Sequence, residues 1–245
     1  MSKDFFILDD ALEGVGDFPQ HQTMSMDSET YDYKALDSVH KLLPNSFLEV
    51  APNFNSIILS SRIILTDNIS SAPIPWYVLI VSDKLLMILE NFNLPPYRVY
   101  PVPVIHDGQK ITNYKAVHIL QPDEFVHEVV FERSKFWATK SFENEKVEEL
   151  QIYSVADLDK AYQTQEGKNH LQVRAEYFSM RKEFLEKMDL FALPSSAFPV
   201  RFYVSSKLRD EIEQAKCTGL RFIRRQDWEE GYMTFFQWSC VLRLD

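Results

Sequence analysis

Short apolar and β-branched runs recur along the chain and predict β-strands. They lie at residues 5–8, 57–65, 76–81, 114–120, 131–137, 150–155, 200–204 and 220–223. The alternating segment 97–105 is also typical of a strand, but Pro101 and Pro103 confine it to an edge or to irregular pairing. Asp107 and Gly108 follow it as a hairpin-type turn signal. The chain is therefore predicted to be rich in short strands.

Helical spacing of apolar residues follows two serines, Ser82 and Ser205, each of which can cap the first turn of a helix. Residues 157–162 form a further short helical candidate. Residues 176–188 fit either a strand that leads into a helix or one continuous helix. Strands and helices mixed in this way predict an α+β fold with a mixed sheet.

The most informative feature is an internal similarity between residues 80–100 and residues 203–223. The two segments align without a gap at a constant offset of 123 positions, over twenty-one residues. The matched pairs are Val81 with Val204, Ser82 with Ser205, Lys84 with Lys207, Leu85 with Leu208, Leu89 with Ile212, Pro96 with Gly219, Arg98 with Arg221 and Val99 with Phe222. Each segment is typical of a strand, a serine-capped helix, a Pro or Gly that ends the helix, and a second strand. We expect two similar strand–helix–strand units within one composite domain.

The composition and hydrophobic pattern of the sequence change near residue 70, which suggests a division there. Residues 1–70 form an acidic N-terminal segment with the first strands, which we expect to pack on the main body. Residues 71–245 form the main α/β domain that contains both units. An aromatic segment, residues 228–238, is expected to supply core strands.

Composition narrows the classes of partner. The net charge is −10, and residues 1–40 hold nine acids against two lysines. Such acidity argues against direct binding of nucleic acid, whose phosphates require Lys and Arg, and it can steer a basic protein partner. Two cysteines do not indicate a disulfide framework. The sequence contains neither a secretory-signal pattern nor an apolar run of about 20 residues, so we expect a cytoplasmic protein without membrane association.

Reactive groups do not form a convincing catalytic set. His106 beside Asp107 fits a surface turn better than a general base, and His118 fits a hydrogen-bonded core residue. His118 and His127, with Glu124 or Glu128, match no known metal-ligand spacing, and Cys217 has no His nearby in the sequence. Six glycines form no phosphate-binding loop. We therefore predict no catalytic site, no metal and no cofactor.

Three segments carry a resemblance to a known family. They are residues 81–104 (VSDKLLMILENFNLPPYRVYPVPV), 113–134 (NYKAVHILQPDEFVHEVVFERS) and 202–223 (FYVSSKLRDEIEQAKCTGLRFI). Together they resemble the immunity-protein domain family that is encoded beside polymorphic and type VI-secreted bacterial toxins. In the middle segment Gln121 and Pro122 depart from the family's strand, and His127 falls near an expected acid; residues 1–70 lie outside the resemblance. The resemblance implies an antitoxin that binds one cognate toxin or effector and has no enzymatic activity.

We expect the toxin to be bound through acidic residues. The six candidates are Asp9, Asp10, Asp17, Glu143, Glu145 and Glu149. A nuclease toxin would fit this charge, because its substrate groove is basic. Two alternatives stay open: a small hydrolase or nucleotide-processing enzyme that uses His106 or His118, and a non-catalytic scaffold or regulatory protein.

Overall fold

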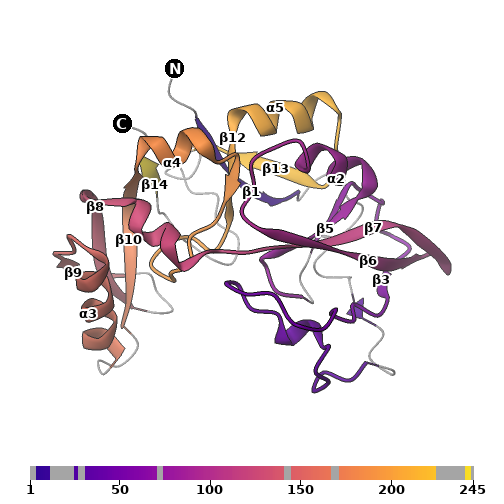
Figure 1. Ribbon diagram of the computed structural model, residues 1–245, viewed down its shortest axis with the longest axis horizontal. Helices are drawn as coiled ribbons and strands as arrows, with labels where there is room; N and C mark the ends of the chain where they lie inside the picture. Colours follow the sequence, from indigo (N-terminus) through magenta and orange to yellow (C-terminus); the bar gives the residue numbers. More distant parts are fainter. Residues whose placement is uncertain are drawn as a thin grey trace.

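The computed structural model describes most of the chain and has an α+β architecture (Figure 1). The described residues are 4–11, 25–26, 31–70, 74–140, 145–166, 171–224 and 241–243. They form three β-sheets with short helices packed on them. The predicted fold class is confirmed. The aromatic segment 228–238 lies outside the described residues.

The first sheet has six strands. In spatial order they are β2 (Ser25–Met26), β3 (Ile57–Leu59), β6 (Tyr97–His106), β7 (Gln109–Ile119), β5 (Val78–Ser82) and β4 (Asn68–Ile69). A two-residue turn joins β6 to β7, with φ of 50° at Asp107 and 73° at Gly108. Positive φ at both central residues is the geometry of a type I′ hairpin, as the Asp-Gly pair predicted.

The structure tests two predictions about this sheet. The pairing of β6 with β7 shifts between Val102 and Val104, on either side of Pro103, which confirms the predicted irregularity. The strand expected over residues 57–65 ends at Leu59 instead. Ser60 forms a turn there: its side chain accepts from the Arg62 N–H at 3.3 Å, and this local bond competes with strand pairing.

The second sheet places the N-terminal strand at its centre. Its order is β11 (Leu190–Phe191), β12 (Phe202–Ser205), β1 (Phe5–Asp10) and β13 (Leu220–Ile223). The strand β1 is antiparallel to both neighbours. Residues on either side of position 70 therefore share one sheet.

The third sheet contains β8, the longest of the described strands. Its order is β14 (Val241–Arg243), β10 (Leu171–Met180), β8 (Val129–Lys140) and β9 (Lys146–Leu150). Helix α3 (Val155–Glu166) packs on β10. After β10 comes α4 (Lys182–Lys187), so the segment 176–188 is a strand that leads into a helix.

Two hydrophobic cores lie on opposite faces of the second sheet. Because side chains alternate along a strand, Phe5 and Ile7 enter the core shared with the third sheet, whereas Leu8 enters the core shared with the first. The same alternation divides Leu190 from Phe191. Figure 1 shows the consequence: β1, β12 and β13 lie between the group of β8, β9, β10 and α3 and the group of β5, β6, β7 and α2.

The two predicted units have the same local structure. One is β5, α2 (Asp83–Leu89) and β6; the other is β12, α5 (Ser206–Gln214) and β13. The Ser82 hydroxyl accepts from the Leu85 N–H, and the Ser205 hydroxyl accepts from the Leu208 N–H, both at 3.2 Å. Both serines are N-caps, as the sequence predicted.

The likeness extends to strands outside the aligned segments. A short antiparallel strand precedes each unit: β4 pairs Asn68 with Val81, and β11 pairs Leu190 with Val204. A further strand lies between the two strands of each unit, antiparallel to both: β7 in the first and β1 in the second. The N-terminal strand therefore occupies in the second unit the place that β7 occupies in the first.

Candidate functional site

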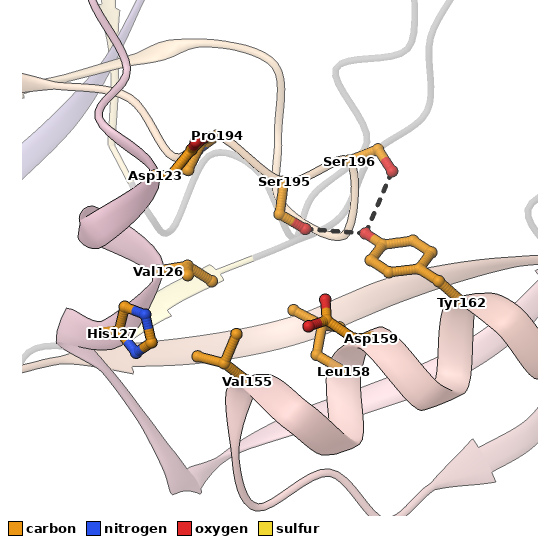
Figure 2. Close-up of a pocket in the computed structure, with 10 residues that line it drawn as sticks. All are labelled: Asp123, Val126, His127, Val155, Leu158, Asp159, Tyr162, Pro194, Ser195 and Ser196. Atoms are coloured by element: carbon orange, nitrogen blue, oxygen red, sulfur yellow. Dashed lines mark hydrogen bonds between the residues drawn. The ribbon is translucent and has the colours of Figure 1, made fainter. Parts of the chain in front are cut away.

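A cleft of about 530 Å³ opens beside the third sheet (Figure 2). Three segments far apart in sequence form it: the 3-10 helix η2 (Asp123–Glu128), the first turns of α3, and the loop at residues 194–196. The sequence fixes the start of α3 locally, because the Ser154 hydroxyl accepts from the Asp157 N–H at 3.2 Å. Ser154 therefore sets where the α3 wall of the cleft begins.

Apolar side chains form the floor of the cleft. Val126, Val155 and Leu158 line it, and Leu158 is only 1% exposed. All three belong to, or pack against, the core between the second and third sheets. The floor is thus the accessible edge of a packed core, which makes it rigid and able to contact an apolar group.

Three hydroxyl groups meet at one side of the cleft. The hydroxyl oxygens of Tyr162 and Ser195 lie 2.8 Å apart, and the Ser196 hydroxyl donates to the Tyr162 oxygen at 3.1 Å. Figure 2 shows these bonds joining α3 to the loop. They fix the loop against the helix. The Ser195 oxygen also accepts from the Ala197 N–H at 3.3 Å, so the Ser196 oxygen, which only donates, is the hydroxyl that keeps its lone pairs at the rim.

Two carboxylates add negative charge to the lining. Asp159 lies one residue beyond Leu158 on α3, and its carboxylate points toward the cleft in Figure 2. Asp123 begins η2 and accepts from the Asn45 side-chain amide at 3.2 Å. Among the ten described lining residues there is no Lys or Arg, and His127 is the one nitrogen-bearing side chain. The cleft therefore combines an apolar floor with an acceptor-rich rim, an arrangement suited to a cation that carries an apolar stem.

The two predicted acids of β1 form ion pairs and hydrogen bonds with other residues of the same chain. Asp9 accepts from the Arg221 guanidinium at 3.1 Å and pairs with that of Arg201 at 3.3 Å. Asp10 accepts from the Asn68 side-chain amide at 3.0 Å, and burial raises its carboxyl pKa above the ordinary value. Both residues contribute to the structure of the second sheet, and their role in partner binding stays a prediction.

The predicted acids near β9 lie in a different sheet and are more exposed. Glu149 is paired with Lys135 at 3.1 Å, and Glu145 is paired with Lys140. Their side chains keep 44% and 56% exposure. These two remain available to a partner that approaches β9. Asp17 and Glu143 lie outside the described residues.

The two histidines of the hydrolase alternative serve structural roles. His118 is completely buried, and its Nε2 lies 2.9 Å from the Leu43 carbonyl oxygen. Burial lowers the pKa of its imidazole, which favours the neutral ring in this core. His106 likewise has its Nε2 2.9 Å from the Ile63 carbonyl oxygen. Each ring holds an irregular segment against the first sheet.

The other reactive candidates are dispersed. His118 is buried on β7 of the first sheet, where its ring lies against Tyr77, whereas His127 lies on η2 at the cleft. Within the part of the chain that the structure describes, no group of three or more His, Cys, Asp or Glu side chains is arranged to hold a metal ion. Burial raises the pKa of the Cys217 thiol, so that its thiolate is disfavoured at neutral pH.

Sequence reasoning missed the cleft. Its residues come from three separate segments, and each segment alone reads as a loop or a short helix. The available signals were the acid-rich helix starts: three acids in residues 123–128 (DEFVHE), and Asp157 with Asp159 in the first turns of α3. Nothing in the sequence places these segments beside one another.

No protein-family model matches the chain, and no curated protein matches it. Among the described residues no helix is both long enough and apolar enough to cross a bilayer.

Proposed function

We propose that this chain is an immunity protein, which neutralises a cognate bacterial toxin by binding it in a stoichiometric complex. The cleft beside η2 and α3 is the observation that carries the proposal. Its apolar floor inside a polar rim is the composition of pockets that receive anchor residues of a protein partner. The sequence resemblance to immunity-protein domains supports the same class.

Charge supports a basic partner surface. The chain carries a net charge of −10, and exposed acids lie both on β9 and at the cleft. Opposite charge accelerates encounter and orients the two proteins before they dock. In this scheme the chain covers the active site of the toxin or the path of its substrate, and a nuclease with a basic groove is the preferred kind of toxin.

The test identifies the genes beside the one that encodes this chain and co-expresses the chain with any toxin-like product found there. We expect growth to be restored, and the purified pair to elute as one species whose mass equals the sum of the two chains. The affinity should fall as salt is raised, since exposed charges are screened over about 10 Å at 0.1 M. Unrestored growth, with both proteins expressed and folded, would contradict the proposal; an affinity independent of salt would remove the electrostatic part alone.

A hydrolase that uses His106 or His118 has less support. The Nε2 of each ring is occupied by a backbone carbonyl oxygen, and His118 has no exposed surface. The variants His106→Gln and His118→Gln separate the classes: toxin neutralisation by the folded variants should persist, whereas a hydrolase would lose activity. The scaffold alternative is decided by the same co-expression test, because a scaffold would protect against no toxin.

A further inference from the structure

We propose that the cleft between η2, α3 and residues 194–196 binds an arginine side chain presented by an exposed segment of a protein partner. This inference rests on the proposed function, which it deepens by naming the residue type that the partner inserts. The cleft volume of about 530 Å³ exceeds that of one side chain, so the residues flanking the arginine enter as well. The occupant is therefore a peptide segment of a folded protein.

The floor fits the aliphatic part of arginine. Val126, Val155 and Leu158 present carbon surface that connects with the second core. Three methylene groups of an arginine stem can cover this surface while the charged group stays at the polar rim. A short cation without such a stem would leave the floor in contact with water.

The rim fits the guanidinium group. A guanidinium has five N–H donors in one plane and no acceptor, so it requires several acceptors around a flat site. The cleft supplies the Asp159 carboxylate on α3 and, across from it, the Ser196 hydroxyl oxygen; the neighbouring Ser195 oxygen already bonds Tyr162 and the Ala197 N–H. Figure 2 shows these groups on facing sides of the cleft, with Tyr162 bridging the loop to the helix. A lysine ammonium, as a compact point charge, would satisfy fewer of them.

The charge of the lining selects a cation. Among the described residues, neither Asp123 nor Asp159 has a Lys or Arg within ion-pair distance; Asp123 accepts a hydrogen bond from the neutral amide of Asn45. By contrast, the β1 acid Asp9 is paired with two arginines of its own chain. Within the described part of the chain no ion pair neutralises these two carboxylates, so their charge can attract a cationic partner.

The test uses the full-length chain and three synthetic peptides. They are acetyl-Gly-Arg-Gly-amide and the same peptide with citrulline or with lysine in place of arginine; citrulline keeps the shape of arginine and removes the charge. Amide ¹H–¹⁵N spectra are recorded during titration. We expect the arginine peptide to shift amide signals of η2, α3 and residues 194–196, with the citrulline peptide causing no shift and the lysine peptide binding more weakly. Equal shifts with all three peptides, or shifts only elsewhere, would overturn the proposal.

Variants assign the effect to the cleft. Asp159→Asn should weaken arginine binding about threefold, as expected for an ion pair with an exposed carboxylate. Asp159→Arg, which supplies an internal guanidinium, should abolish the binding. Glu124→Gln is the matched control, because it removes the same charge from η2 at an exposed residue outside the lining, and it should bind like the original chain. Equal loss in Glu124→Gln and Asp159→Asn would show a general charge effect and reject the site.

Negative results in the peptide titration and in the toxin test contradict different proposals. Neutralisation of the toxin without any arginine-dependent shift would reject the cleft proposal and leave the proposed function standing. Arginine-dependent shifts without neutralisation would reject the proposed function alone. With an active toxin in hand, Asp159→Arg should weaken the complex by about tenfold or more, whereas Glu124→Gln should not.

Discussion

The two strand–helix–strand units share their local structure but are completed in different ways. In the first unit the intervening strand β7 follows β6 through a two-residue turn. In the second unit the same place is taken by β1, which comes from the other end of the chain. The ladder positions correspond: Val117 faces Leu79 and Val99, while Leu8 faces Phe202 and Phe222. One architecture is thus reached once by a local hairpin and once by long-range pairing.

The two units are joined through a reciprocal pair of aspartates. Asp67 accepts from the Ser82 hydroxyl of its own unit at 2.7 Å and from the Thr218 N–H of the other unit at 2.9 Å. Asp189 accepts from Ser205 at 2.8 Å and from the Asn93 N–H at 3.1 Å. Each carboxylate thereby binds its own helix cap and the loop after the opposite helix.

This exchange explains why the units form one composite domain. Each aspartate orients the serine hydroxyl that caps its own helix, and each also accepts from a backbone N–H in the loop of the other unit. Closing the second unit also orders a far longer stretch of chain than closing a hairpin does, at an entropic cost that grows with loop length. The second unit should therefore be the more sensitive of the two to changes at its junctions.

Removal of β1 gives the largest expected effect. Deleting residues 1–11 takes Phe5, Ile7 and Leu8 out of two cores, and each buried side chain contributes about 1.5–3 kcal/mol. That loss is comparable to the whole stability of a typical domain, about 5–15 kcal/mol, so we expect no cooperative thermal unfolding transition by circular dichroism. Deletion of residues 1–3 alone is the control. A cooperative transition in the longer deletion would show that β12 and β13 do not need β1.

Gly219→Ala tests the contact between the units. Gly219 has φ of +84°, and a Cβ there would overlap the Asn68 carbonyl oxygen and the Thr66 side chain of the first unit. We expect a loss of more than about 3 kcal/mol in the free energy of unfolding, measured in urea. Gly108→Ala has a similar φ of +73° but open space around it, so it should cost only about 1–2 kcal/mol. Similar losses in the two variants would mean that backbone strain, and not the junction, sets the cost.

Substitution of the two aspartates compares the junctions directly. Asp189 is buried, whereas Asp67 is only partly buried, so water can replace more of the lost bonds at Asp67. Asp189→Ala should cost about 3 kcal/mol and Asp67→Ala about 1.5 kcal/mol in urea unfolding. A larger loss at Asp67 would contradict the view that the second unit is the more sensitive.

Sequence patterns predicted the local part of this comparison and missed the non-local part. The gapless match at offset 123 identified Ser82 and Ser205 as equivalent caps, because capping depends on a few neighbouring residues. It did not identify β1 as the counterpart of β7, since FFILDD shares no pattern with the β7 sequence and pairing over long separation leaves no local trace.

At the candidate site, too, the sequence did not predict which residues from distant segments come together. Asp9 and Asp10 were selected for their charge, although the four apolar residues before them already indicate a strand buried on both faces. The cleft was not selected, because its floor and rim meet only after the third sheet has formed. Acidic composition could indicate a partner of opposite charge, but it could not separate carboxylates paired inside the chain from those left open.

The smallest expected effect concerns Asp10, the residue whose ladder position in the first unit is occupied by Ile119. Burial raises the pKa of the Asp10 carboxyl in the folded state, so the folded chain binds its proton more tightly than the unfolded chain does. The cost of the buried charge therefore appears as pH rises through the ordinary value of 3.8, and it is complete above the folded pKa. Asp10→Asn should be more stable than the original chain at pH 7, and the difference should shrink toward pH 4 in urea unfolding at each pH.

Asp67→Asn should show the opposite sign. Hydrogen bonds from Ser82 and Thr218, with the charge of Lys84, outweigh burial and lower the pKa of the Asp67 carboxyl. The stability that Asp67 contributes is therefore present at neutral pH and is lost as pH falls through that lowered pKa. A change of stability with pH in the same direction for Asp10→Asn and Asp67→Asn would contradict this contrast. Burial of the Asp10 charge would then not distinguish the second unit from the first.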